Sequence, residues 1–238
     1  MHLLNSINEL LVHGTKWNRL DISDPLTGEL LTSRVDPELK IVNNEPISSE
    51  HYLDYFHGQL SVSPNNNWLI DNGWEWHPLG SVTSWNINEW IINNVWESED
   101  GKSKKSLWWG KYDWNEPVCW ISETEIGIVG RFDYDLVDED DIHNYTSDLL
   151  FRIIDVRDGR ELKRFNIDDG NLFFDEYLYC SSQDRGFKIY DIITGNEIYN
   201  ENSINTKVYH SMSKEFLSIV NNELTICKLF KEKVCDNV

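Results

Sequence analysis

The sequence has few cysteines and no long apolar run. Its four cysteines lie far apart among 238 residues and form no Cys-x-x-Cys pair, so a zinc site or a dense disulfide framework is not expected. The first residues lack the basic start and apolar core of a signal peptide, and no run approaches the roughly 18 apolar residues of a membrane helix. These absences predict reduced thiols, a cytoplasmic location and no membrane span.

Basic residues are also scarce. The chain has 21 Lys and Arg against 41 Asp and Glu, which gives a net charge of -20, and acidic residues are in excess in both halves. Such a chain repels phosphate, so nucleic acid and anionic membranes are excluded as expected partners. A negative field speeds encounter with positive surfaces, which favours a basic protein partner.

The sequence does contain a repeated turn. An Asp stands four residues before a Gly in Asp24–Gly28, Asp155–Gly159 and Asp191–Gly195, and degenerate copies are centred on Asn86 and Lys228. An Asp side chain that bonds to its own turn, followed by a Gly with positive φ, is typical of a tight connection between strands. These five positions are therefore interpreted as strand ends.

The residues before each turn alternate as in a half-buried strand. An apolar residue stands four positions earlier in every copy and two positions earlier in all but one, where Ser84 takes its place. Another strand and a polar hairpin turn precede each of these strands. The last two spacings, Asp155 to Asp191 and Asp191 to Lys228, are 36 and 37 residues. About four strands per period near 40 predicts an all-β propeller with about five blades.

The two earlier spacings are longer, 62 and 69 residues. We attribute the extra length to loop insertions near 36–57, 92–116 and 136–147 within a single propeller domain spanning 1–238. The last insertion includes an acidic stretch, which fails as an EF-hand loop and is interpreted as a solvated loop. Because few residues precede the first strand, either the N-terminal residues clasp the last blade or the ring is incomplete.

The unit 187–197 resembles the end of a WD40 repeat, with Tyr190-Asp191 and Trp85-Asn86 at the positions of the family's Trp-Asp pair. The resemblance covers roughly residues 8–232, and the segment 54–101 is similar to bacterial WD40-like repeat proteins of unassigned function. It implies a β-propeller that acts as a binding platform, without implying a particular ligand.

Tryptophan is concentrated in one part of the chain, since ten of the 11 lie between Trp68 and Trp120. Trp68 and Trp85 occupy strand patterns and are expected in the core. The other aromatic residues of this region could form a contact patch for a protein or a sugar, or could fold back and cap their own blade. The candidate binding residues are Trp74, Trp76, Trp108, Trp109, Tyr112 and Trp114.

Three histidines, His51, His57 and His77, are close in sequence to acidic residues. A metal site needs convergent ligands, and no His-Glu-x-x-His motif supports one, so neither a metal nor a cofactor is expected. His57 and His77 are kept as candidate binding residues at strand ends. No catalytic residue is assigned, because no nucleophile elbow or dinucleotide fingerprint is present.

The leading functional prediction is a non-enzymatic interaction scaffold whose loop and aromatic surface residues bind a protein partner. Two alternatives stay open. One is a propeller hydrolase or lyase that acts on a carbohydrate or small ester in the central funnel, and the other is a lectin-like carbohydrate binder.

Overall fold

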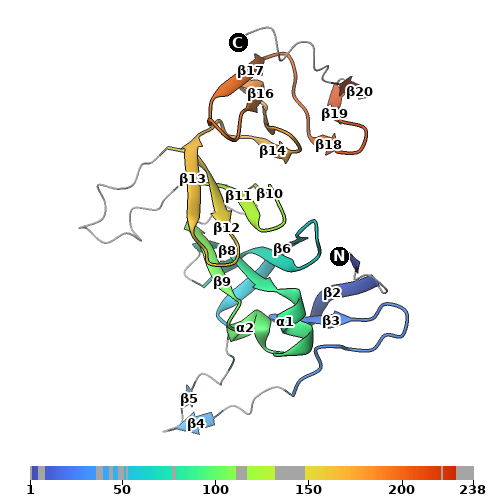
Figure 1. Cartoon of the computed structure of the whole chain (residues 1–238), viewed down its shortest axis with the longest axis vertical. Coiled ribbons are helices and arrows are strands. Elements are labelled where there is room, and N and C mark those ends of the chain that lie inside the picture. The colour runs from blue at the N-terminus through green and yellow to red at the C-terminus, as the bar shows by residue number, and fades with distance from the viewer. Residues whose placement is uncertain are drawn as a thin grey trace, which may run out of the picture.

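The computed structural model shows antiparallel sheets that follow one another along an arc, from the sheet that contains β2 and β3 to the sheet that contains β19 and β20 (Figure 1). It describes residues 2–4, 9–35, 40–42, 45–47, 51, 53–76, 79–110, 117–131, 148–220 and 222–228. The all-β, propeller-like class predicted from the repeats is confirmed.

Five sheets of three or four strands, here called sheets 1 to 5, follow chain order, which is close to the predicted number of units. Sheet 1 contains β1 (His2–Leu4), β2 (Glu9–Lys16) and β3 (Arg19–Ser23). Sheet 2 contains β6 (Tyr55–Val62), β7 (Trp68–Glu75), β8 (Leu79–Asn86) and β9 (Lys105–Gly110). Sheet 3 contains β10 (Val118–Trp120), β11 (Glu125–Gly130), β12 (Leu150–Asp155) and β13 (Glu161–Asn166).

Sheet 4 contains β14 (Asn171–Phe174), β15 (Leu178–Ser182), β16 (Gly186–Tyr190) and β17 (Glu197–Glu201). Sheet 5 contains β18 (Val208–His210), β19 (Glu215–Val220) and β20 (Glu223–Lys228). Within every sheet each strand pairs with the next one along the chain, as in successive hairpins.

The hydrophobic core lies between the sheets. Four apolar clusters fill the four junctions, from sheets 1 and 2 to sheets 4 and 5, and each cluster draws buried residues from both neighbours. At the first junction, for example, Leu20 and Ile22 pack against Leu69 and Trp85. Neighbouring sheets therefore stabilise one another, as expected for units that cannot bury both faces alone.

The three Asp-to-Gly turns share one geometry. The backbone N–H of Leu26, Arg157 or Ile193 donates to the side chain of the Asp two residues earlier, at 2.7, 3.0 and 2.7 Å. Gly28, Gly159 and Gly195 have φ of 74°, 74° and 79°, where other residues are strained. Each Gly N–H also donates to the carbonyl of the same Asp. The predicted strand ends are confirmed in all three copies.

Asn86 takes a different role from the degenerate turn that was predicted. Its side chain accepts a hydrogen bond from the backbone N–H of Glu89 at 3.1 Å and caps helix α1 (Ile87–Ile92), which is followed by α2 (Glu97–Asp100). An Asx side chain serves a helix N-terminus as well as a turn, and here no Gly follows to close the turn. Neither helix in the described part of the chain is long or apolar enough to cross a membrane.

Two of the predicted insertions contain regular structure. Residues 92–116 were expected to be irregular, but they include α2 and β9, and β9 pairs with β8 as the outer strand of sheet 2. A register shift between Val82 and Thr83 interrupts the alternation by which such a strand is recognised in a sequence. Residues 36–57 include the ribbon of β4 (Lys40–Val42) and β5 (Glu45–Ile47). Residues 136–147 lie outside the described residues.

Trp85 lies at the junction between sheets 1 and 2, where it is fully buried and meets Trp90 edge to face at 5.7 Å. Its substitution tests how much this junction contributes to stability. Trp85→Ala should lower the free energy of unfolding by about 3–5 kcal/mol, because it leaves a cavity that the neighbouring sheets cannot fill. Denaturant titration followed by circular dichroism measures the change. Trp109→Ala, at a side chain 55% exposed, is the control and should cost less than about 1 kcal/mol. Equal losses in the two variants would contradict this account.

Candidate binding surfaces

Four aromatic side chains gather where sheets 1 and 2 meet, and we call them the aromatic platform: Trp17, Phe56, Trp74 and Trp76. Phe56 and Trp74 stack with ring centroids 4.0 Å apart, and Trp17 meets Phe56 edge to face at 5.9 Å. Trp76 lies 6.0 Å from Phe56 and 6.3 Å from Trp74. The candidate binding residues Trp74 and Trp76 are therefore part of a larger cluster.

The strands hold this platform in place. Phe56 and Trp74 are direct cross-strand partners in β6 and β7, which explains their stacking. Trp17 stands in the turn between β2 and β3, where Asn18 has a positive φ of 53°. The Asn18 side chain donates to the carbonyl of Leu53 at 2.8 Å, which ties this turn to the segment just before β6.

The outer rings of the platform face solvent, since Trp17 is 85% exposed and Trp76 is 59% exposed. Grouped exposed aromatic side chains are uncommon on a monomer surface and are typical of contact sites. Aromatic rings with few rotatable bonds also lose little entropy when a partner covers them. The platform can therefore supply a preorganised apolar contact.

An acidic pocket of about 400 Å³ lies at the same end of the β6–β7 hairpin. Three carboxylates, those of Asp54, Glu75 and Asp100, line it together with one amine, that of Lys104. Burial lowers the pKa of Lys104, although the nearby Glu99 carboxylate acts in the opposite direction. Lys104 Nζ also donates to the Glu99 carbonyl at 2.9 Å. The carboxylates outnumber the amine, so the pocket suits a cationic group.

His57, a predicted site residue, bonds to a buried carboxylate: its Nδ1 lies 2.5 Å from Oδ2 of Asp71, which is fully buried. The backbone N–H of Gly58 donates to the other oxygen of Asp71 at 2.9 Å. In the described ranges no group of three or more His, Cys, Asp and Glu side chains could hold a metal ion. His77 lies outside the described residues.

Of the candidate binding residues Trp108 and Trp109, the first is buried and the second is exposed. Trp108 is only 7% exposed and packs in the core between sheets 2 and 3, with the Arg152 guanidinium 4.2 Å above its ring. Its ring is therefore not available to a partner, which corrects the expectation of a contact residue. Trp109, the next residue of β9, points to the opposite face and is exposed. Tyr112 and Trp114 lie outside the described residues.

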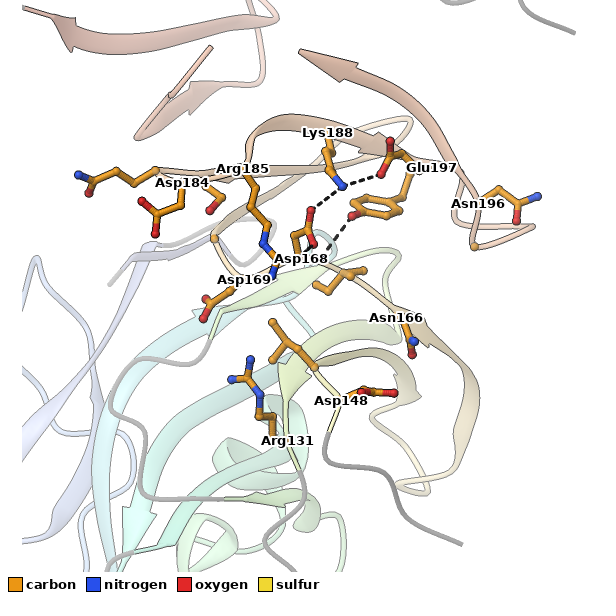
Figure 2. A pocket seen from close by; sticks show the side chains of 17 residues that line it. Arg131, Asp148, Asn166, Asp168, Asp169, Asp184, Arg185, Lys188, Asn196 and Glu197 are labelled. Atoms are coloured by element: carbon orange, nitrogen blue, oxygen red, sulfur yellow. Dashed lines mark hydrogen bonds and ion pairs between the residues drawn. The ribbon is translucent and has the colours of Figure 1, made fainter. Parts of the chain in front are cut away.

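A wider polar pocket of about 940 Å³ lies between sheets 3 and 4 (Figure 2). Its centre is the carboxylate of Asp168, which lies 2.5 Å from Arg185 and 2.6 Å from Lys188. Lys188 also bonds to Glu197 at 2.7 Å. Figure 2 shows Lys188 between the two carboxylates, so the charges at the centre of the pocket largely neutralise one another.

The pKa values in this pocket follow from its ion pairs. Burial alone would raise the pKa of Asp168, but hydrogen bonds from Lys188 and Arg185 outweigh it and hold the pKa below its ordinary value. Burial raises the pKa of Tyr190 to about 12. At neutral pH the carboxylate is thus charged and the phenol is neutral, and the Asp168 carboxylate serves to join β16 to the start of sheet 4.

Sequence reasoning missed Trp17 and the Asp168 network. Trp17 is far from the other tryptophans in the chain, and only the packing of sheet 1 on sheet 2 brings it to Phe56. A Trp next to Asn in a hairpin turn, where apolar residues are unusual, was the available signal. Asp168 belongs to a connection between sheets, and nothing in the spacing of 168, 185 and 188 distinguishes it among 41 acidic residues.

No protein-family model matches the sequence, and no curated protein matches it. Solved structures with a similar backbone include the computationally designed Ika8 protein, at 15% identity and a TM-score of 0.45, with 93% of this chain and 59% of that chain covered. BamB from Moraxella catarrhalis matches at 13% identity and a TM-score of 0.43, covering 91% of this chain and 57% of that chain. This chain therefore spans less than two thirds of the length of either.

The Asp168 ion pairs give a pH-dependent contribution to stability. Because the pKa of Asp168 is depressed in the folded state, its contribution is present above the unfolded-state pKa and is lost as the pH falls through the folded-state value. Asp168→Asn should lower the free energy of unfolding by about 1–3 kcal/mol at neutral pH, and the difference from the unmodified protein should shrink on acidification. Denaturant titrations between pH 7 and about pH 3 measure it. Asp184→Asn, at an exposed carboxylate of the same pocket, is the control. If the difference in stability between Asp168→Asn and the unmodified protein stays constant with pH, the assignment is contradicted.

Proposed function

We propose that the chain is a WD40-like, non-enzymatic interaction module that binds a basic segment of a protein partner at the aromatic platform. The single observation that carries the proposal is the exposed platform built from two sheets. Trp17 comes from sheet 1 and Trp76 from the end of sheet 2, and both are exposed although their neighbours hold them in a fixed cluster.

The acidic pocket supports the basic character of the partner. Tyr55 and Glu75 are cross-strand partners and line the pocket. The next pair along the strands, Phe56 and Trp74, belongs to the platform. Because adjacent residues of a strand point to opposite faces, the pocket and the platform lie on opposite faces of the same hairpin end. A partner that covers this end can place an apolar side chain on the rings and a Lys or Arg at the carboxylates. The net charge of -20 favours the encounter with such a partner.

A library of basic peptides, with charge-reversed acidic peptides alongside, tests the proposal by fluorescence polarisation. Basic peptides that also contain an apolar residue should bind, and raising the ionic strength from ~50 to ~300 mM should weaken the binding because the charges are screened. Trp17→Ala combined with Trp76→Ala should weaken the best peptide by tenfold or more, since both exposed rings of the platform are lost.

Trp109→Ala is the matched control, because Trp109, at 55%, is about as exposed as Trp76, at 59%, but lies on the outer strand of sheet 2. It should leave peptide affinity unchanged. Binding that is independent of salt, or that Trp109→Ala weakens as much as the platform variant does, would overturn the proposal. Binding on a glycan array that is lost in the platform variant would assign the site to a carbohydrate instead.

A further inference from the structure

The third strand of each sheet directs two side chains at the following sheet. They stand two and four positions before the repeated turn position, which is Asp24, Asn86, Asp155 or Asp191. In sheets 1 to 4 all of them pack into the junction with the next sheet. Their exposure is 6% or less in every case. They are Leu20, Ile22, Val82, Ser84, Phe151, Ile153, Phe187 and Ile189.

The corresponding residues of sheet 5 are exposed, because no described residue covers them. Leu224 is 65% exposed and Ile226 is 58% exposed. Their cross-strand neighbours extend the same face: Ile219 opposite Leu224, Leu217 opposite Ile226, and Val208 opposite Leu217. We call these five residues the aliphatic face of sheet 5. Its reverse side, with Phe216 and Cys227, is packed on sheet 4.

The four other junctions indicate what kind of surface such a face accepts, which is the apolar face of another antiparallel sheet. The free face of sheet 1 in the same chain does not match this requirement. On that side of β3, Asp21 is covered by its own polar neighbours, Arg19 at 3.0 Å, Arg34 at 2.5 Å and Thr32 at 2.9 Å. Beside this network His13 bonds to Ser23 at 2.8 Å, so this side presents mainly polar groups. An aliphatic face packed there buries little apolar surface on the sheet 1 side, so ring closure on sheet 1 and head-to-tail stacking of copies gain less than contact between two aliphatic faces.

The aliphatic face of sheet 5 in a second copy does match. The five side chains that define it are aliphatic, and among the described residues it is flanked by His210 and by the ion pair of Glu215 with Lys228 at 3.8 Å, which carries no net charge. Two such faces can meet without the repulsion that a net charge of -20 creates elsewhere on the chain. Contact between identical faces is also closed by a two-fold axis, so it stops at a dimer.

We propose that the aliphatic face of sheet 5 is a self-association surface through which two copies of the chain form a two-fold dimer. The proposal concerns a different part of the molecule from the aromatic platform, so each can fail without the other. A dimer would present two platforms, which gives a partner with two basic segments the advantage of bivalent binding.

Sedimentation velocity of the full chain over a range of concentrations tests the dimer. The unmodified protein should sediment as a dimer that dissociates on dilution. Leu224→Thr combined with Ile226→Thr should weaken dimerisation at least tenfold, because it removes apolar contact while keeping residues that favour strands. Raising salt from ~50 to ~500 mM should leave the dimer intact or strengthen it, since screening reduces repulsion between the acidic copies.

The matched control is Leu26→Thr combined with Ile193→Thr, at two aliphatic side chains that are each 85% exposed in turns. This variant should dimerise like the unmodified protein, and circular dichroism should show that both double variants are folded. A protein that is monomeric at every concentration would overturn the proposal. Equal dimerisation of the two folded double variants would overturn it as well, because the contact would then lie elsewhere.

Discussion

Burial of apolar sheet faces against the neighbouring sheet is the interaction on which this structure depends. In the part of the chain that the structure describes, no sheet has more than four strands, and sheets 2, 3 and 4 each carry apolar side chains on both faces. Such a unit exposes too much apolar surface to be stable alone, so each sheet requires its neighbours. By the same requirement, the exposed aliphatic face of sheet 5 is stabilised when another apolar sheet face covers it.

The connections between strands are stabilised by local hydrogen bonds, whereas the core is stabilised by contacts between sheets. The Asp-to-Gly turns satisfy their own backbone groups, so they can sit at the surface and need no contact with other sheets. Sheet 2 departs from this plan, because α1 and α2 replace the turn and pack Trp90 into the first junction. The longer connection also brings Glu99 to Arg34, which ties sheet 2 to the segment after sheet 1.

The two candidate surfaces contrast in how their polar groups are used. In the pocket between sheets 3 and 4, Asp168, Lys188 and Glu197 bond to one another, so the charges mainly hold the structure together. At the aromatic platform the backbone and Asn18 fix the position of the cluster, and two rings still face solvent. Preorganised but uncovered groups are the ones that bind a partner at low entropic cost.

The sequence by itself determined the strand ends, the alternation before them and the propeller-like class, because turn chemistry and period 2 act over a few neighbouring residues. It also placed Trp85 in the core, as the structure confirms. Only the tertiary structure decided that Trp108 is buried, that Asn86 caps a helix and that Trp17 joins the platform. Those outcomes depend on which sheet packs against which, and local patterns carry no information about contacts between residues far apart in the chain.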